Sequence, residues 1–316
     1  MDKGHKIGVV GAGQVGATCA YTLLLGGLVS DLVLIDLNAE RVRGEALDLS
    51  HALSLRPPAE VIAGTYADLA GADIVIIAAG VSQKPGESRM DLVRGNAKVF
   101  RQIIPEIMRY APDALLLIVT NPVDVLTFEA QRLSGLLEGR VIGSGTVLDT
   151  ARLRFLISRH AQIDPRNIHA YVLGEHGQSE LPAWSAARVA GMELDAYCNL
   201  CNRCEGSLMR FAMEAFDAQV RNVADEIIRA KGATYYAVAV AVQRIVEAIL
   251  RDEQAILTVS TVQKGAYGLY DVALSMPSIV GREGVRQVLA VGLDQAEEVA
   301  LMQSAEAIRA GIRAMG

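Results

Sequence analysis

A glycine-rich turn near the N-terminus constrains the fold of this chain more than any other feature. Residues 6–10 predict a short apolar strand, a Gly-x-Gly-x-x-Gly motif follows at Gly11, Gly13 and Gly16, and residues 17–25 predict a helix. In such a motif the first glycine allows a sharp turn, the second lets backbone approach a pyrophosphate, and the third lets the helix pack on the strand. The stretch predicts a dinucleotide-binding βαβ unit; a glycine turn of another α/β protein is the alternative.

An acidic residue stands where this kind of unit binds a ribose. Asp36 follows Gly16 by twenty residues and ends a second apolar run at residues 32–35. A carboxylate at this position accepts hydrogen bonds from the hydroxyls of an adenosine ribose. Because the next four residues include no Arg or Lys to bind a 2′-phosphate, the sequence favours NAD over NADP.

The length and composition of the chain limit the class of protein. A chain of 316 residues exceeds one ordinary core, and its pattern changes near residue 145, so we expect domains at 1–143 and 144–316. The hydrophobic content of 51% argues against disorder, and a net charge of −6 offers no basic field for nucleic acid or an anionic membrane. Since no apolar run could span a bilayer and the N-terminus is no signal peptide, we expect a cytoplasmic protein.

Three of the four cysteines form a Cys-x-x-Cys-x-x-Cys pattern, at Cys198, Cys201 and Cys204. The pattern resembles part of an iron–sulfur motif, but a cluster or a zinc site needs a fourth ligand. Cys19 lies in the predicted nucleotide helix, and no other His or Cys is near in sequence. We therefore predict reduced thiols and no metal site.

Strand and helix patterns alternate through the first half, which predicts βαβ units and a parallel sheet. Apolar runs at residues 74–79 and 115–119 suit strands covered on both faces, and residues 141–142 supply a last strand. Asn121–Pro122 is a candidate cis peptide bond, although trans is the commoner form.

The second half has an α+β pattern. Asp294 and Glu297 predict a capping box for the final helix. We expect other helices at 146–160, 184–189, 208–231 and 234–251, and strands at 168–173, 255–262 and 272–274. The predicted fold class is α/β: a Rossmann-type parallel sheet followed by an α+β substrate domain.

A histidine between glycines is the first candidate for chemistry. His176, within Gly174-Glu175-His176-Gly177, follows the strand predicted at 168–173. Flanking glycines let a ligand approach closely, and an imidazole exchanges protons near neutral pH. The alternative is a turn histidine without a chemical role.

Two further polar clusters could complete a site. Asp149 and Arg152 are three residues apart, so they share a face of a predicted helix: the carboxylate could orient an imidazole, and the guanidinium could bind a carboxylate. Gln83 and Arg89 lie on a loop rich in Pro, Gly and Ser that suits a mobile lid. A surface ion pair and a solvated charged loop are the respective alternatives.

These stretches together resemble the NAD-dependent lactate/malate dehydrogenase family. The resemblance covers essentially the whole chain, because the motifs occur in the same order as in the family. They are GAGQVG, AAGVSQKPGESR, TNPVD, GSGTVLDTAR, LGEHG and KGATYY.

The resemblance implies a role for each candidate. His176 exchanges the proton of the substrate hydroxyl, and Asp149 holds its tautomer and stabilises its charged form. Arg152 binds the substrate carboxylate, Arg89 polarises the C2 oxygen when the lid closes, and Asn121 bonds to the substrate. We expect cofactor contacts at Gly11, Gly13, Val15, Gly16, Asp36, Arg41, Tyr66, Gly80, Val81, Asn121 and Ser144.

The lid residue Gln83 bears on the choice of substrate. Malate dehydrogenases of the family have an Arg here to pair the second carboxylate of oxaloacetate, and an unpaired buried charge costs several kcal/mol. A neutral Gln83, with Thr234 lining the same pocket, favours pyruvate and lactate, and hence a place in fermentation after glycolysis. A malate dehydrogenase or a broader 2-hydroxyacid dehydrogenase remains the alternative.

The resemblance also raises the question of regulation. Bacterial lactate-branch members are often activated by fructose 1,6-bisphosphate, bound by an Arg and a His of facing subunits in a tetramer. Arg154 and His169 match these positions, with an ordinary interface pair as the alternative. After LGEHG the family commonly has Asp, where this chain has Gln178, so the pKa of His176 should differ from that in its relatives.

Two other classes share the glycine turn and its acidic partner. A nucleotide-sensing regulator would not require His176, Asp149, Arg152 and Arg89 together. An S-adenosylmethionine-dependent methyltransferase would not need arginines for a carboxylate. Both explain less of the sequence than a dehydrogenase does.

Overall fold

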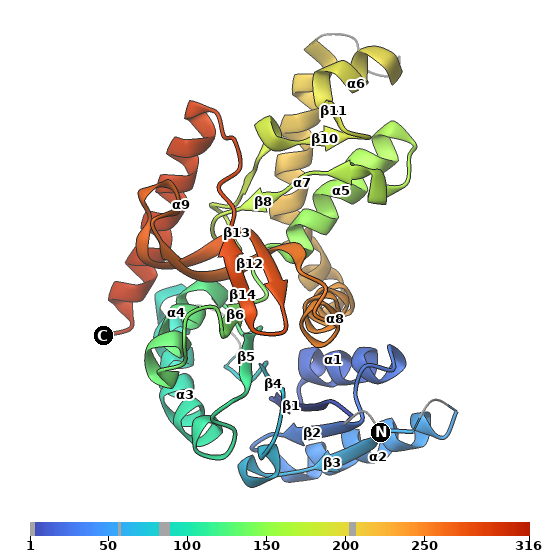
Figure 1. Ribbon diagram of the computed structural model, residues 1–316, viewed down its shortest axis with the longest axis vertical. Coiled ribbons are helices and arrows are strands. Elements are labelled where there is room, and N and C mark those ends of the chain that lie inside the picture. The colour runs from blue at the N-terminus through green and yellow to red at the C-terminus, as the bar shows by residue number, and fades with distance from the viewer. Residues whose placement is uncertain (1–3, 56–57, 82–88, 202–206) are drawn as a thin grey trace.

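The computed structural model describes residues 4–55, 58–81, 89–201 and 207–316. Within these ranges a nine-stranded sheet runs in the order β14-β13-β12-β6-β5-β4-β1-β2-β3 (Figure 1). Its parallel part consists of β1 (Lys6–Val10), β2 (Asp31–Ile35), β3 (Glu60–Ala63), β4 (Ile74–Ile77), β5 (Leu115–Ile118) and β6 (Val141–Gly143).

Helices cover both faces of the parallel part, which explains its continuous apolar strands. Every residue of β4 and β5 is buried. One face packs against α1 (Gln14–Leu25), α2 (Ala39–Leu53) and α8 (Tyr236–Leu250), and the other against α3 (Arg89–Tyr110) and α4 (Val123–Ser134). The strands β2 and β4 lie on opposite sides of β1, so the order of strands in the sheet reverses at this point. In parallel sheets, ligands bind at the carboxyl ends of the strands where such a reversal occurs.

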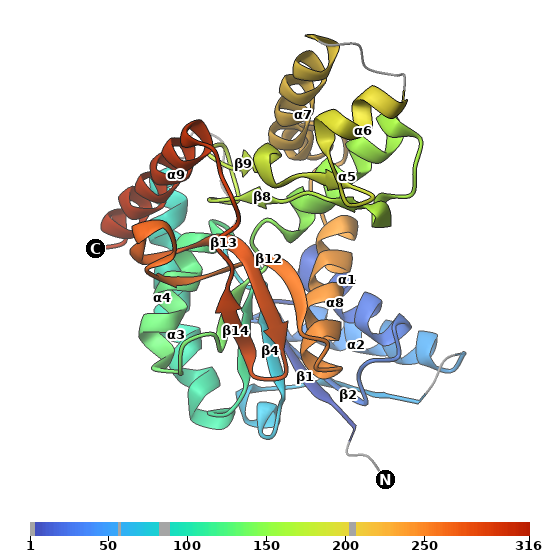
Figure 2. The ribbon, with the colours of Figure 1, turned by 45° about the horizontal axis from the view of Figure 1, so that its top comes forward.

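The second half of the chain extends the same sheet. The antiparallel strands β12 (Ala255–Lys264), β13 (Tyr270–Gly281) and β14 (Gly284–Val288) continue beyond β6, where Ser260 pairs with Gly143 (Figure 2). The strand β14 was not predicted, and β13 is longer than expected. The helix α9 (Gln295–Ala314) packs against α3 and α4, so it contacts elements of the first half.

The remaining elements form a layer beside this extension (Figure 2). They are α5 (Val147–Ala161), β7 (Ile168–His169), β8 (Val172–Leu173), β9 (Leu181–Pro182), β10 (Arg188–Val189), β11 (Met192–Glu193), α6 (Leu194–Cys201) and α7 (Ser207–Lys231). The strand predicted at 168–173 is wrong as one element, because β7 pairs with β10 and β8 with β9 in separate sheets. The helix predicted at 184–189 is a 3₁₀ turn at Trp184–Ala186 followed by β10.

Local signals in the sequence account for several helix ends. Asp294 and Glu297 form the predicted capping box at the start of α9. Gly232, with φ of +88°, follows α7 in a conformation that favours glycine. The Asn121–Pro122 peptide bond is cis.

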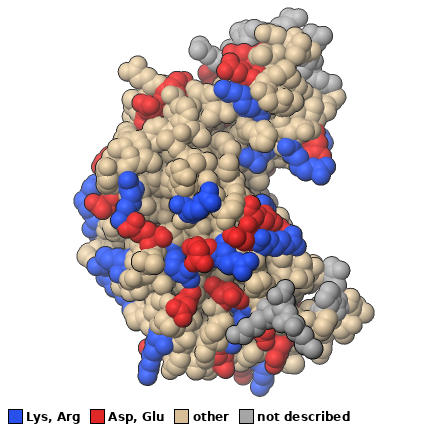
Figure 3. All heavy atoms as spheres, viewed as in Figure 1, with Lys and Arg blue, Asp and Glu red and all other residues tan. Residues whose placement is uncertain are grey.

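Charges are mixed over the molecule. Figure 3 shows acidic and basic side chains interspersed on one face, and an indentation along one side of the molecule. Among the helices that the structure describes, none is both long and apolar enough to cross a bilayer.

Candidate active site

The glycine turn has the geometry of an anion site at the start of α1. Gly11 has φ of +102°, and a Cβ there would lie 2.4 Å from the backbone nitrogen of Ala79. A Cβ on Gly16 would lie 1.8 Å from the carbonyl oxygen of Gly11, so both glycines are required by close backbone contacts. A Cβ on Gly13, by contrast, would meet no described atom within 4 Å.

The first N–H groups of α1 are therefore available to a ligand. Gly13 is the N-cap residue, and among the described residues no side chain caps the helix. The dipole and the N–H groups at such a helix start attract negative charge. The uncapped helix start and the open space at Gly13 are the features that a dinucleotide-binding turn offers to a pyrophosphate.

Asp36 lies beside this turn, as predicted. Its Oδ2 accepts a hydrogen bond from the Ala12 N–H at 2.8 Å, and its Oδ1 accepts from the Asn38 N–H at 3.0 Å. Asn38 in turn caps α2 by accepting from the Arg41 N–H at 3.0 Å. The carboxylate is thus fixed at the carboxyl end of β2, next to the adenosine end of a dinucleotide bound at the turn.

A buried asparagine that we did not predict joins two of the cofactor loops. The Oδ1 of Asn96 accepts from the Val81 N–H at 2.7 Å, and its Nδ2 donates to the carbonyl oxygen of Asn121 at 2.8 Å. A Cβ on Gly80 would lie 2.5 Å from a methyl of Thr120, so only glycine fits between these loops. Tyr66, another predicted cofactor contact, starts a 3₁₀ turn at Tyr66–Leu69.

His176, Asp149 and Arg152 come together as predicted. The Nδ1 of His176 lies 2.6 Å from Oδ2 of Asp149, and Oδ1 of Asp149 accepts from a guanidinium nitrogen of Arg152 at 2.8 Å. The side chains of Asp149 and Arg152 are only 1% and 15% exposed, so the alternative of a surface ion pair is wrong. The carboxylate of Asp149 thus links the imidazole to the guanidinium.

Polar groups far apart in sequence hold His176 in place. The Thr150 hydroxyl on α5 accepts from the Val172 N–H at 2.9 Å, which ties β8 to the helix that carries Asp149. The backbone N–H of His176 donates to Oδ2 of Asp124, a buried carboxylate of α4, at 2.7 Å. Asp124 was not predicted as a site residue, because a carboxylate in the first turn of a helix looks like an ordinary helix-start residue.

Charged neighbours and burial have opposite effects on the pKa values of His176 and Asp149. Burial alone lowers the pKa of His176, but the charge and hydrogen bond of Asp149, with contributions from Glu180 and Asp124, raise this pKa to about 9. Burial raises the pKa of Asp149, but His176 and Arg152 together hold it below its ordinary value. In the absence of ligands, the pair is therefore an imidazolium and a carboxylate at neutral pH.

A cavity of about 110 Å³ adjoins this group. The predicted residues Asn121, Ser144 and Thr234 line it together with Arg152 and His176. The other residues that line the cavity are neutral and were not predicted: Val119, Gly145, Leu148, Ala224, Ile228, Val238 and Ala241. On α7 and α8 the apolar residues that line the cavity have the same spacing as the residues of the hydrophobic core. No signal in the sequence therefore distinguishes the two groups.

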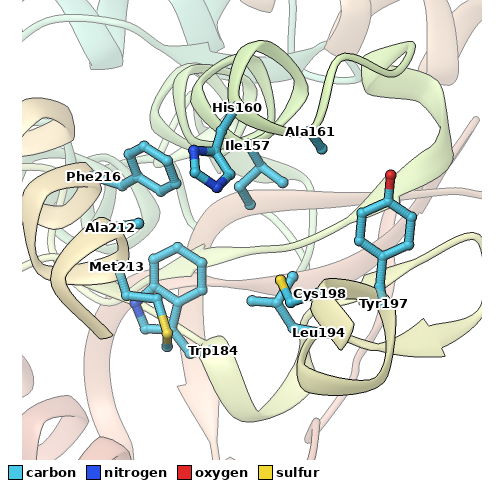
Figure 4. Close-up of a pocket in the computed structure, with 10 residues that line it drawn as sticks. All are labelled: Ile157, His160, Ala161, Trp184, Leu194, Tyr197, Cys198, Ala212, Met213 and Phe216. Carbon is cyan, nitrogen blue, oxygen red and sulfur yellow. The ribbon is translucent and has the colours of Figure 1, made fainter. Parts of the chain in front are cut away.

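Some predicted features lie outside the described structure. Gln83 falls between the described ranges, and Arg89 is the first residue of α3, with its side chain not described. Of the cysteine pattern, Cys204 is likewise outside. Cys198 is buried at an apolar cavity beside Trp184 and Met213 (Figure 4).

The two residues matched to a regulatory site lie close to each other. The Nε of Arg154 donates to the carbonyl oxygen of Ala170 at 3.0 Å, directly after His169. Burial lowers the pKa of Arg154, although its guanidinium stays charged at neutral pH. His169 is exposed and pairs with Arg188 across the β7–β10 ladder.

Three features together indicate the class of protein: the glycine turn, the carboxylate of Asp36 beside it, and the His–Asp–Arg group. This class is the dinucleotide-dependent dehydrogenases. The chain belongs to the lactate/malate dehydrogenase family: the model of the NAD-binding domain matches residues 5–143, and that of the α/β C-terminal domain matches residues 146–315. Its cofactor is therefore NAD, and the predicted α/β fold class is confirmed.

Curated and solved proteins agree with this membership. The chain is 52% identical to an L-lactate dehydrogenase of Acetivibrio thermocellus over 310 residues, covering 98% of this chain and 97% of that protein. It is 53% identical to an L-lactate dehydrogenase of Thermoanaerobacter sp. (strain X514), covering 98% of both. A solved minor L-lactate dehydrogenase from Enterococcus mundtii superposes with a TM-score of 0.94 at 40% identity, covering 99% of both chains.

Proposed function

We propose that this chain is an L-lactate dehydrogenase, which transfers hydride reversibly between NADH and pyruvate to give L-lactate. The observation that carries the proposal is the His176–Asp149 hydrogen bond beside Arg152, at a cavity whose other described walls are neutral. A single guanidinium in a neutral cavity suits a substrate with one carboxylate. The malate alternative is not favoured, because the similar curated proteins are named L-lactate dehydrogenases.

His176 acts as the proton donor and acceptor in this proposal. Asp149 accepts the Nδ1–H of the ring, so Nε2 is the nitrogen left for the substrate. In pyruvate reduction, Nε2 gives its proton to the carbonyl oxygen while C2 gains the hydride that bound NADH supplies. In lactate oxidation, the neutral ring takes the hydroxyl proton back.

The other residues bind and polarise the substrate. Arg152 uses one N–H for Asp149 and has further donors for the substrate carboxylate. Asn121 bonds to the substrate, and Arg89 stabilises charge on the C2 oxygen. Gln83 and Thr234 are neutral, so neither offers a second positive charge to the substrate.

The test is the consumption of NADH, followed by absorbance, with pyruvate or oxaloacetate as substrate. We expect kcat/KM to be far higher for pyruvate, by about 10³-fold, because the second carboxylate of oxaloacetate would be buried unpaired. The variant Gln83→Arg should reverse the order. Equal efficiency with the two substrates in the parent enzyme would contradict the proposal, and no NADH oxidation with either would return the nucleotide sensor and the methyltransferase as alternatives.

We further propose a homotetramer, a cytoplasmic location and a role in fermentation, where pyruvate reduction regenerates NAD for glycolysis. Support for self-association comes from an open apolar cavity of about 680 Å³ between α5 and α7. Phe155, at its edge, is 58% exposed, and a large exposed apolar surface marks an interface more often than free surface. The division into domains at 143/144 also stays a proposal.

Arg154 and His169 form the proposed site for fructose 1,6-bisphosphate between subunits. Arg154 on α5 bonds to the backbone beside His169, and His169 on β7 is an exposed titratable side chain, so an anionic ligand could contact both.

A further inference from the structure

A second carboxyl group lies against the His176–Asp149 pair and has no part in the mechanism above. Glu180 is only 4% exposed. One ring nitrogen of His176 and one carboxyl oxygen from each of Asp149 and Glu180 all lie within 4.8 Å of one another. The Oε1 atom of Glu180 is buried with no hydrogen-bond partner among the described residues.

The two carboxyl groups have unequal surroundings. Asp149 is hydrogen-bonded to both His176 and Arg152, and these contacts favour its ionised form. The buried, unpartnered oxygen of Glu180 receives no such support, and the charge of Asp149 opposes a second charge close by. Of the two groups, Glu180 is therefore the one that holds a proton.

The charged groups around Glu180 come from four places in the fold. Asp149 and Arg152 lie on α5, and His176 lies on the loop that also carries Glu180. Asp124 acts on His176 from α4. On α7, Arg221 acts on Glu180, and its guanidinium lies 3.8 Å from the carboxylate of Asp217.

These groups place the titration of Glu180 close to that of His176. Burial and then the charge of Asp149 raise the pKa of Glu180 to about 8, against the opposing effect of His176, Arg152 and Arg221. Ionised Glu180 in turn raises the pKa of His176. The two titrations are coupled, because each group changes its charge within the pH range in which the other group titrates.

We propose that Glu180 is a positioning residue of the active site that sets the pH range over which His176 stays protonated. Near neutral pH its carboxyl group is neutral, so it does not repel a substrate carboxylate at Arg152. At higher pH it ionises and retains the proton on His176. The inference rests on the proton-transfer role proposed above for His176.

The experiment is an NMR titration of the unliganded enzyme with 13Cε1-labelled histidine. The chain has five histidines, and the His176 signal is assigned as the one lost in His176→Asn. In Glu180→Gln, which keeps the size of the side chain, the midpoint of His176 should move down by about one pH unit. Asp217→Asn, which removes a partly buried carboxylate of α7 that lies outside the cluster, should leave the midpoint in place.

An unchanged midpoint in Glu180→Gln would overturn the proposal, as would an equal shift in Asp217→Asn. If Glu180→Gln does not fold, the wild-type curve still decides: coupling to Glu180 should make the His176 titration broader than that of a single independent proton, and a curve that fits one independent proton would contradict the coupling. These signals do not depend on turnover, so a failure here is distinct from a failure of the proposed activity.

Kinetics give a second readout. At pH 7 the variant should reduce pyruvate with a kcat/KM close to that of the wild type. At pH 9 the protonated fraction of His176 should fall from about one half to about one tenth, so kcat/KM should be about fivefold lower. A merely structural role would lower both values alike.

Discussion

At the scale of the residue, the chemistry of this site depends on one carboxylate. Asp149 is 1% exposed and is hydrogen-bonded to both an imidazole and a guanidinium. It fixes the tautomer of His176 and favours its charged form, while burial alone would favour the neutral ring. The rise of the His176 pKa to about 9 is therefore caused mainly by the charge and hydrogen bond of Asp149.

The substitution Asp149→Asn tests this account. Pyruvate reduction needs a protonated His176, so in the wild type kcat/KM should fall as the pH rises through about 9, while lactate oxidation should rise. Without the carboxylate, the pKa of His176 should fall, and reduction should be lost at lower pH. We expect a loss of about 10³-fold in kcat at neutral pH, since the tautomer is no longer fixed.

The pH–rate profile checks this prediction in both directions, with saturating NADH for pyruvate reduction and saturating NAD for lactate oxidation. Asp217→Asn, at a carboxylate outside the pair, is the control. A variant with the wild-type profile would show that Asp149 has no electrostatic role.

At the scale of the element, the glycines at the start of α1 are of two kinds: one is required by packing, and the other is not. Gly16 is required by packing, because a Cβ would lie 1.8 Å from a backbone oxygen. Gly13 is free of contacts with described atoms and has φ of −73°, a conformation open to any residue. Since the described fold does not require a glycine at position 13, we attribute it to the proposed contact with the pyrophosphate.

A pair of alanine substitutions should separate these effects. Gly16→Ala should lower the free energy of unfolding by about 1–3 kcal/mol, because the turn must move, and should also weaken NADH binding. Gly13→Ala should leave the unfolding midpoint unchanged but weaken NADH binding, by about tenfold or more, because the new methyl occupies the approach of the pyrophosphate. Thermal unfolding and NADH fluorescence titration measure the two quantities. Full NADH affinity in Gly13→Ala would place the pyrophosphate elsewhere.

At the scale of the whole molecule, a single sheet joins the two halves of the chain. The antiparallel strands of the second half continue the parallel sheet at β6, and α9 packs against α3 and α4. The site takes Asn121 from the first half and Arg152, His176 and Thr234 from the second. The shared sheet therefore brings residues from both halves of the chain to one cavity.

The proposed regulation also acts at this scale. Fructose 1,6-bisphosphate should lower the apparent KM for pyruvate, measured at low substrate, because its two phosphates would pair with Arg154 and His169 across an interface. Arg154→Gln should abolish this response. Arg166→Gln, which changes a side chain 89% exposed on the same side, is the matched control. No change in apparent affinity with the sugar bisphosphate would identify the pair as an ordinary interface contact.

Several parts of this protein depend on local order along the chain and could be predicted before any contact was known. The glycine turn, Asp36 at the end of β2, the capping box of α9 and the buried strands follow from the spacing of neighbouring residues, because steric and hydrogen-bonding rules act over short stretches. The ordered set of motifs gave the family, and the joint occurrence of His176, Asp149 and Arg152 indicated a catalytic site before their contacts were known.

Which distant residues meet depends on how the helices and strands pack, and short stretches of sequence do not reveal this packing. Asp124, Asn96 and Glu180 look in sequence like an ordinary helix-start residue, a helix residue and a loop residue. Their roles arise because the fold places Asp124 and Glu180 beside His176 and Asn96 beside Asn121, two residues that line the cavity. The apolar residues of α7 and α8 that face it follow the same period as core residues. Spacing along a helix reveals that a face is apolar, but the surface that this face meets is set by the packing of the whole chain.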